Sequence, residues 1–305
     1  MPRTRELVEK GIRETSYCEP EAGSRPRRTK TRVLGALFPN FDFFHAGMLD
    51  AVEKVLSRYH YHVMTSGYED DATRMREKLS VLRGRDLDGI ICSPVKSSFG
   101  SLRQLSKPAL PIVTYNNLVE TWETDHVQID DRFAAARLVE HLINMNHRKI
   151  AVVSGDRETT TGLNRLQGYQ DALWAAGIEE RPEYIRGGEW GHMGSVHWAR
   201  ELLTLPDPPT AILVSNYLLA NGVLKYCRES GIRIPDDVSI VSFDDTMTFQ
   251  LHQPPITVMR QPLTQIAEEV AMLIFRRMSG DWDNFPVIRT LQAEMVLRES
   301  VRKLP

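Results

Sequence analysis

The chain has 305 residues, which is enough for two domains or for one large α/β unit. Hydrophobic residues make up 42% and charged residues 26%, which is ordinary for a globular protein and excludes a fibrous or low-complexity chain. The net charge of −2 argues against a uniformly basic nucleic-acid coat protein. Residues 1–32 nevertheless hold nine Lys/Arg and five Asp/Glu, a net of +4, whereas the other 273 residues hold 29 and 35, a net of −6. A basic head on an acidic body indicates a polyanion-binding arm.

The cysteines and the N-terminal sequence indicate the cellular compartment of the protein. Cys18, Cys92 and Cys227 are far apart and form no CxxC or Cys/His cluster, so a disulfide framework and a structural zinc site are not expected. The start, MPRTRELVEKGIRE, has no apolar core of a signal peptide. No apolar run reaches the roughly 18–20 residues of a membrane span. We expect a cytoplasmic protein without metal or cofactor.

In the first half of the chain, short β-branched runs alternate with helical patterns. Strands are predicted at residues 32–38, 60–65, 88–92, 110–115 and 126–129, and helices at 46–59 and 71–82. This alternation with short connections implies parallel pairing through right-handed crossovers.

The same pattern restarts after Asp130. Helices are predicted at residues 132–145, 163–176, 195–203, 218–230 and 263–278, and strands at 149–153, 183–186, 210–215, 238–243 and 287–297. The fold class is therefore α/β, with two doubly wound parallel-sheet lobes in tandem and a ligand cleft between them. We assign residues 1–31 to a head and linker, residues 32–130 and 258–284 to the first lobe, and residues 131–257 and 285–305 to the second.

Polar residues gather just after predicted strands, where open parallel sheets bind ligands. Asp130 and Asp131 follow one strand, the segment GDRETTTGLNR ends at Arg165, Asn216 follows TAILVS, and Asp244 follows VSIVSF. Carboxylates accept hydrogen bonds from vicinal hydroxyls, while Arg and Asn donate them. The set suits a polyhydroxylated ligand.

The chain resembles the lactose-repressor (LacI/GalR-type) family of bacterial transcription regulators. The resemblance rests on these stretches, in family order: VQIDDRFAAARLVEHLINMNHRKIAVVSG, RLQGYQDALWAAGI, PTAILVSN, GIRIPDDVSIVSFDD, PPITVMRQPLTQIAEEVAMLI and LRES. It implies a periplasmic-binding-protein fold, a dimer, and an effector that is a sugar or a nucleoside-like metabolite.

The resemblance also assigns ligand contacts. Arg165 resembles the family's effector-binding Arg, Asp244 its hydroxyl-accepting carboxylate, and Asn216 the Asn of an Asn-Asp pair whose Asp is here Tyr217. Asp130 matches a carboxylate in the cleft between the lobes. Asn216 has the alternative of capping the helix that follows it.

Three aromatic or hydroxyl positions complete the candidate set. Trp190 stands where an aromatic commonly stacks on the ligand ring, with interlobe packing as its alternative. Phe44 or His45 falls where an aromatic pair ends the first loop. Thr161, in the segment that leads to Arg165, is the remaining candidate. Asp245, beside Asp244, is expected to cap a helix or turn.

The head departs from the family pattern. The segment RTRELVEKGIRETSY resembles only the last helix of the family's helix-turn-helix domain, so the recognition helix that would read the major groove is not expected here. Pro26 replaces the Leu that wedges between base steps in the hinge. Arg25, Arg27 and Arg28 are candidate phosphate contacts, with a solvated linker as the alternative.

The leading hypothesis is a ligand-responsive, DNA-binding transcription regulator, or its effector core, with operator DNA as partner if the missing head is present in the native protein. A headless regulator acting through mixed dimers and a solute-binding protein are the alternatives. An enzyme is not expected, because the chain has no GxSxG elbow, no HExxH and no paired catalytic carboxylates.

Overall fold

The computed structural model describes residues 30–69, 71–83, 86–94, 110–119 and 122–305. Residues 32–305 form a compact unit that is distinct from residues 1–31. The predicted last helix of the head and the candidate phosphate contacts Arg25, Arg27 and Arg28 lie outside the described residues. No helix in the described ranges combines the length and apolar character needed to span a membrane.

The first lobe contains a sheet of six strands in the order β11-β5-β4-β3-β1-β2. Its strands are β1 (Val33–Phe38), β2 (His62–Gly67), β3 (Gly89–Cys92), β4 (Ile112–Tyr115), β5 (Asp125–Ile129) and β11 (Ile288–Leu291). Every pairing in this sheet is parallel. All four residues of β3 and of β4 are buried, which agrees with their central places.

The second lobe contains a sheet of six strands in the order β12-β10-β9-β8-β6-β7. Its strands are β6 (Ile150–Ser154), β7 (Ile185–Gly187), β8 (Ala211–Val214), β9 (Ser239–Phe243), β10 (Thr257–Arg260) and β12 (Glu294–Val296). All pairings are parallel except that of β12 with β10. The predicted pair of parallel α/β lobes is confirmed.

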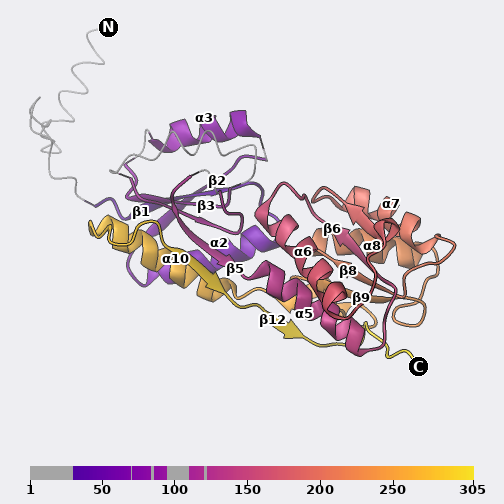
Figure 1. The fold of residues 1–305 in the computed structure, drawn as a ribbon. Helices are drawn as coiled ribbons and strands as arrows, with labels where there is room; N and C mark the ends of the chain where they lie inside the picture. The colour runs from indigo at the N-terminus through magenta and orange to yellow at the C-terminus, as the bar shows by residue number, and fades with distance from the viewer. Residues whose placement is uncertain (1–29, 70, 84–85, 95–109, 120–121) are drawn as a thin grey trace, which may run out of the picture. The chain divides into compact units, whose positions relative to one another are not determined.

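Helices cover both faces of each sheet (Figure 1). In the first lobe, α2 (Phe43–Ser57) packs beside α10 (Leu263–Met278), and α3 (Ala72–Arg83) lies on the other face. In the second lobe the pairs are α5 (Asp131–Asn144) with α6 (Thr160–Ala175), and α7 (His192–Leu203) with α8 (Tyr217–Glu229). The shorter helices are η2 (Pro182–Tyr184) and α9 (Met247–Leu251).

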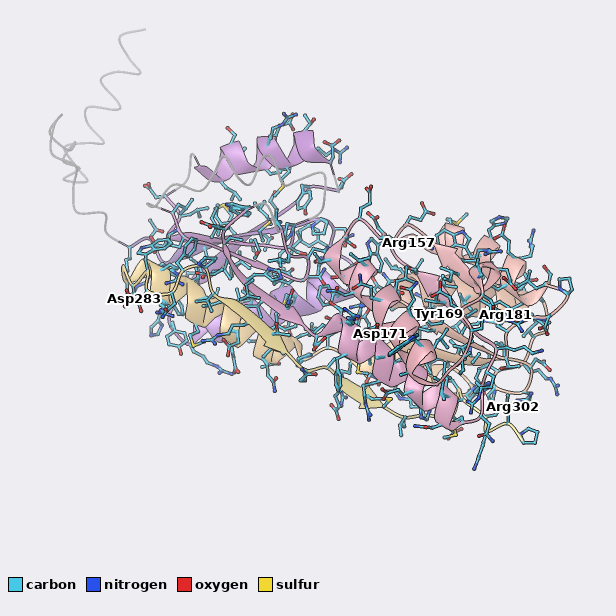
Figure 2. The ribbon with its side chains drawn as sticks, viewed as in Figure 1. Arg157, Tyr169, Asp171, Arg181, Asp283 and Arg302 are labelled. Carbon is cyan, nitrogen blue, oxygen red and sulfur yellow. The ribbon has the colours of Figure 1, made fainter. Side chains whose placement is uncertain are left out.

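Side-chain alternation along β6 divides the core of the second lobe. Ile150 and Val152 belong to the cluster that includes α5 and α6, whereas Ala151 and Val153 belong to the cluster that includes α7 and α8. Gly168 lets α5 and α6 approach closely, because a Cβ there would lie 2.1 Å from a backbone oxygen of α5. Asp171 of α6 (Figure 2) pairs with Arg132 of α5 across the same contact.

The strands that exchange between the lobes differ from the predicted division. β10 lies in the second sheet, whereas residues 258–260 were expected in the first lobe, and β11 lies in the first sheet, whereas residues 285–291 were expected in the second. The predicted strand over 287–297 is two short strands in two different sheets. Gln292 and Ala293 carry the chain between them, so the stretch predicted as one strand spans a lobe crossing.

A buried ion pair holds β11 in the first sheet. Arg277 of α10 donates from Nε and Nη2 to Asp125 of β5, at 2.7 and 3.0 Å, and both side chains are at most 1% exposed. The Asp125 carboxylate also accepts from the backbone N–H of Val287, which leads into β11. The Arg277 guanidinium lies within 5.5 Å of the ring centroids of Trp282 and Phe285.

Candidate functional site

A cavity of about 860 Å³ lies where the carboxyl ends of the two sheets face each other. Such edges are the usual ligand sites of open parallel sheets. The first lobe lines the cavity with Pro39, Asn40, Asp42, Phe44, His45, Ser93, Asn116 and Asn117. The second lobe and the strand that leaves it contribute Asp156, Thr159, Thr161, Arg165, Gly188, Glu189, Trp190, Gly191, Asn216, Tyr217, Leu218, Asp244 and Gln261.

Arg165 is the cation at the base of the cavity. It is 2% exposed, and its guanidinium carbon lies 3.8 Å from the ring centroid of Phe243. Nε donates to the Asp131 carboxylate at 2.6 Å, and Nη1 donates to the Ser215 carbonyl at 2.5 Å. Within the described part of the chain, no hydrogen bond uses Nη2. The guanidinium is therefore held rigidly with one donor group left for a ligand.

Burial raises the pKa of Asp131 above its ordinary value, while the charge and hydrogen bond of Arg165 work against that rise. The pair places one negative and one positive charge side by side beneath the cavity. Arg165 therefore offers a ligand hydrogen-bond donors without much net positive potential.

Asp244 faces Arg165 from the end of β9. Its φ of +72° lies in the left-handed region, which Asp tolerates better than most residues. One carboxylate oxygen accepts from Gln261 at 2.7 Å, and the other lies 3.4 Å from the backbone nitrogen of Tyr217. Burial raises the pKa of Asp244, and Arg165 opposes that rise. The strained turn points the carboxylate into the cleft.

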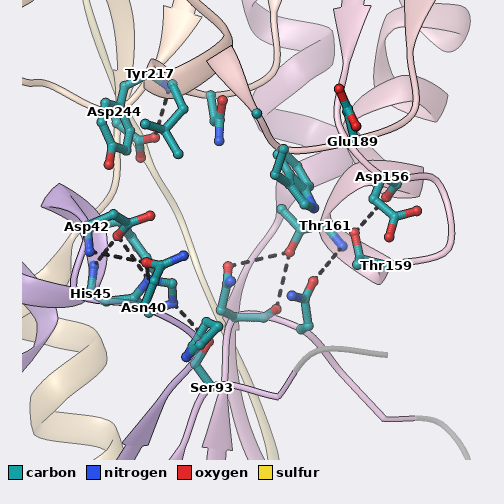
Figure 3. Close-up of a pocket in the computed structure, with 18 of the residues that line it drawn as sticks. Asn40, Asp42, His45, Ser93, Asp156, Thr159, Thr161, Glu189, Tyr217 and Asp244 are labelled. Carbon is teal, nitrogen blue, oxygen red and sulfur yellow. Dashed lines mark hydrogen bonds and ion pairs between the residues drawn. The ribbon is translucent and has the colours of Figure 1, made fainter. Parts of the chain in front are cut away.

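The first loop contributes a hydrogen-bonded chain (Figure 3). Asp42 is the N-cap of α2, and its Oδ1 accepts from the backbone N–H of His45 at 2.9 Å and contacts His45 Nδ1 at 2.9 Å. His45 Nε2 lies 3.2 Å from Ser93 Oγ. Burial acts to raise the pKa of Asp42, but its contacts with His45 outweigh this and lower the pKa.

Asp42, His45 and Ser93 are the residue types of a hydrolase triad, but here their hydrogen bonds hold the imidazole ring of His45 in place. Ser93 has no exposed surface, and its backbone N–H donates to the Leu37 carbonyl. With both ring nitrogens of His45 engaged inside the protein, the ring presents its face and edge rather than a free donor. These three hydrogen-bonded side chains thus form a rigid wall of the cavity.

Trp190 forms the opposite aromatic surface. Its ring lies against Gly155, where an added Cβ would come within 2.2 Å of the ring. A side chain at this position, just after β6, would displace the indole. Phe44 lines the cavity from the first lobe. Two aromatic side chains from different lobes therefore flank the space where a ring would bind.

Several hydrogen bonds join the lobes at the rim. The backbone N–H of Leu118 donates to Thr160 Oγ1 at 2.9 Å. Thr161 contacts Asn116 and Asn117 at 3.4 Å. On the other side of the cavity, Phe43 N–H donates to the Tyr217 hydroxyl at 3.0 Å. These hydrogen bonds hold the two lobes together around the cavity.

The structure brings seven of the eight predicted ligand residues to this cavity: Arg165, Asp244, Asn216, Trp190, Phe44, His45 and Thr161. Asp130 is the exception, because its carboxylate accepts from Phe133 N–H at 3.0 Å and caps α5. Asn216 lines the cavity, and its predicted alternative as a helix cap is confirmed, since its Oδ1 accepts from Leu219 N–H at the start of α8.

Asp245 does not cap a helix as expected. Its carboxylate is paired with Arg298 at 2.7 Å and lies 3.5 Å from Arg260, while Thr246 caps α9. Sequence reasoning also missed polar lining residues of the first lobe: Asn40, Asp42, Ser93, Asn116 and Asn117. Each follows a strand of the first sheet, so the strand-end rule could have found them.

The described lining is acidic. It carries the carboxylates of Asp42, Asp156, Glu189 and Asp244 against the single guanidinium of Arg165, which is already paired with Asp131. Among the residues that the structure describes, no three His, Cys, Asp or Glu side chains are grouped to hold a metal ion. The cavity is therefore suited to hydroxyl groups and unsuited to a phosphate or carboxylate.

Comparison with known proteins agrees with this geometry. The family model of the periplasmic binding protein-like domain matches residues 139–301. The repressor CytR of Escherichia coli K12 is 28% identical over 303 residues, covering 99% of this chain and 89% of the relative. The transcriptional regulator CelR of Thermobifida fusca is 29% identical over 313 residues, covering 98% and 90%.

The chain belongs to the lactose-repressor family of transcription regulators. Among solved structures of this family, the CelR–cellobiose complex aligns with a TM-score of 0.81 at 27% identity, covering 98% of this chain and 91% of that one. The transcription regulator CcpA of Lactococcus lactis has the same fold, with a TM-score of 0.82 at 24% identity, covering 90% of this chain and 100% of that one. The family resemblance read from the motifs is confirmed.

Proposed function

We propose that the protein is a cytoplasmic, ligand-responsive transcription regulator whose effector is an uncharged, hydroxylated ring compound of the sugar or nucleoside class. The observation that supports this most directly is the cavity itself. Two aromatic side chains flank it, Arg165 and Asn216 offer donors, and its carboxylates accept from hydroxyls.

The effector acts through the two lobes. A ligand that contacts both lobes binds best when they are closed on it, and so shifts the population toward that form. In a homodimer, closure changes the spacing of the two DNA-binding heads, and the ligand–operator coupling must be reciprocal. The CelR relative is solved with cellobiose, which is consistent with a hydroxylated effector for this chain.

Isothermal titration against a panel of neutral sugars and nucleosides, each paired with its phosphate ester, tests the proposal. We expect one class of neutral compound to bind and its phosphate ester to bind at least tenfold more weakly, because the lining is acidic. Tighter binding of the ester than of the neutral compound would contradict the proposed class.

The variant Arg165→Met tests whether the effector binds in this cavity. Losing hydrogen bonds from a charged donor costs about 1.5–3 kcal/mol, or about 10- to 150-fold in affinity. Arg157→Met is the matched control, because Arg157 (Figure 2) is exposed and does not line the cavity. Equal affinity of the wild type and Arg165→Met would move the effector to another site.

A further inference from the structure

Tyr217 joins the lobes at the mouth of the cavity. Its backbone opens α8 in the second lobe, beside the carboxylate of Asp244 (Figure 3). Its hydroxyl reaches the start of α2 in the first lobe, where it accepts from Phe43 N–H at 3.0 Å. The two rings meet edge to face, with centroids 5.7 Å apart. Tyr217 is only 8% exposed.

The contact satisfies a backbone group that the helix leaves open. Phe43 is the first residue of α2, and the N–H groups of a first helical turn have no partner within the helix. Asp42 caps the N–H of His45 two residues later, so the Phe43 N–H still needs an acceptor. In this structure that acceptor comes from the other lobe.

The same side chain stands between two acidic groups. Burial, with the charges of Asp42 and Asp244, raises the pKa of the Tyr217 phenol, so it remains protonated at neutral pH. Asp42 belongs to the first lobe and Asp244 to the second, and the charge of Asp42 adds to burial in raising the pKa of Asp244. A neutral phenol between them separates like charges that would otherwise face each other as the lobes approach.

From this geometry we propose that Tyr217 is an interlobe latch, a positioning residue that stabilises the closed arrangement before any effector binds. The latch is made by the hydroxyl on Phe43 N–H and by the ring on the Phe43 side chain. Because these contacts exist only when the lobes are bridged, they bias the equilibrium toward the binding-competent form and raise apparent affinity for the effector.

This position also departs from the family pattern. The pattern has an Asp after the Asn, and here Tyr217 stands in its place. An Asp side chain is too short to make both the ring contact and the hydroxyl contact that Tyr217 makes with Phe43. The inference builds on the proposed two-lobed sensor, but its test needs no effector, so the two can fail separately.

Distances between spin labels in the two lobes of the full chain test the latch without ligand. Glu53→Cys on α2 and Arg200→Cys on α7 provide exposed labelling sites, and Cys18→Ser removes the thiol of the head. Cys92 and Cys227 are buried, and burial raises the pKa of Cys227 to about 12, so both stay unlabelled.

We expect the wild type to centre on the distance that the structure gives between these sites. Tyr217→Phe should raise the ratio of longer to bridged distances about fivefold, the equivalent of one net hydrogen bond of about 1 kcal/mol. Phe43→Ala removes the ring contact without touching the cavity lining, and the two changes should be non-additive.

Tyr226→Phe is the control, because Tyr226 lies on the same helix but in the core of its own lobe. Its distances should match the wild type. Superimposable distributions for the wild type, Tyr217→Phe and Phe43→Ala, with thermal melts showing all three folded, would overturn the latch. A wild type that already shows mainly the longer distance would overturn it as well.

Discussion

Two arginines in this molecule are buried against aspartates, and they have different consequences. Arg277 and Asp125 lie inside the first lobe with side chains 1% and 0% exposed. Arg165 and Asp131 lie beneath the cleft at 3% and 5%. Burial alone does not distinguish them. Arg277 uses all three nitrogens, since its Nη1 also donates to the Asp281 carbonyl at 2.7 Å.

Arg165 is left with one nitrogen that makes no described hydrogen bond, and it lines a cavity. A buried cation with an unused donor, rather than a buried cation as such, is therefore the feature that supports the proposed site. The first pair fixes a strand, and in the proposed site the second pair leaves a donor for the effector.

Arg277→Met gives the largest expected effect in this comparison. Removing one partner leaves Asp125 buried without its cation, so we expect a loss of about 3–5 kcal/mol in the free energy of unfolding by denaturant titration. Affinity of the remaining folded protein should be unchanged. Arg276→Met is the control, because its partly exposed pair with Asp281 should contribute less than about 1 kcal/mol. Equal losses of unfolding free energy in both variants would contradict the larger contribution expected of the buried pair.

Asp131→Asn should cost less, about 1–3 kcal/mol. Arg165 would keep the Phe243 ring, the Ser215 carbonyl and the nearby Asp244 charge as compensation. The same change removes a negative charge beneath the cavity, so phosphate esters in the titration panel should gain affinity relative to their neutral parents. A loss of unfolding free energy as large as that of Arg277→Met would show that the two buried ion pairs contribute equally to stability.

His126, next to Asp125 on β5, tests what burial costs without a charged partner. Burial lowers its pKa to about 3. The folded protein therefore keeps His126 neutral down to about pH 3, whereas the unfolded chain binds a proton near pH 6.5, so stability falls as pH falls through that window. From pH 6.5 to 5 the loss is about 2 kcal/mol.

Thermal or denaturant unfolding across that pH range measures the loss. His126→Gln should flatten the pH dependence even if it lowers stability at neutral pH. His62→Gln serves as the control, because His62 is exposed on β2. An unchanged slope in His126→Gln would assign the acid sensitivity to other groups.

Asp130→Ala should have the smallest effect. It removes the N-cap of α5 and should cost about 1 kcal/mol of stability, while Asp130→Asn retains a good cap and costs little. Neither should alter effector affinity by titration, because Asp130 does not line the cavity. A tenfold loss of affinity in Asp130→Ala would restore it as a ligand contact.

Periodicity was sufficient for most of the fold, because buried parallel strands are short apolar runs between amphipathic helices. Periodicity did not predict which sheet a strand joins, because that depends on residues far away in the chain. The strand TVMR follows Pro254 and Pro255 and was not anticipated, and the run 287–297 hides the crossing at Gln292. A strand's partner is a long-range property that the run itself does not encode.

The site was predictable where a residue ends a strand, as for Asn216 and Asp244. Between the neighbours Asp130 and Asp131, spacing could not say which one caps the helix and which one turns inward to Arg165. The role of Tyr217 was also out of reach, because its partner at Phe43 is 174 positions away in the chain. Contacts between lobes depend on how the two sheets face each other.

The course of the last strands has a consequence for how the protein is made. β11, near the C-terminus, is the edge strand of the first sheet, and β12 is the edge strand of the second. A nascent chain emerging from the ribosome therefore exposes an unpaired edge on β5 and on β10 until residues 288–296 have been synthesised. Both sheets lack an edge strand until then, so a translation product stopped short of residue 288 would be a target for chaperones and proteases rather than a smaller working sensor.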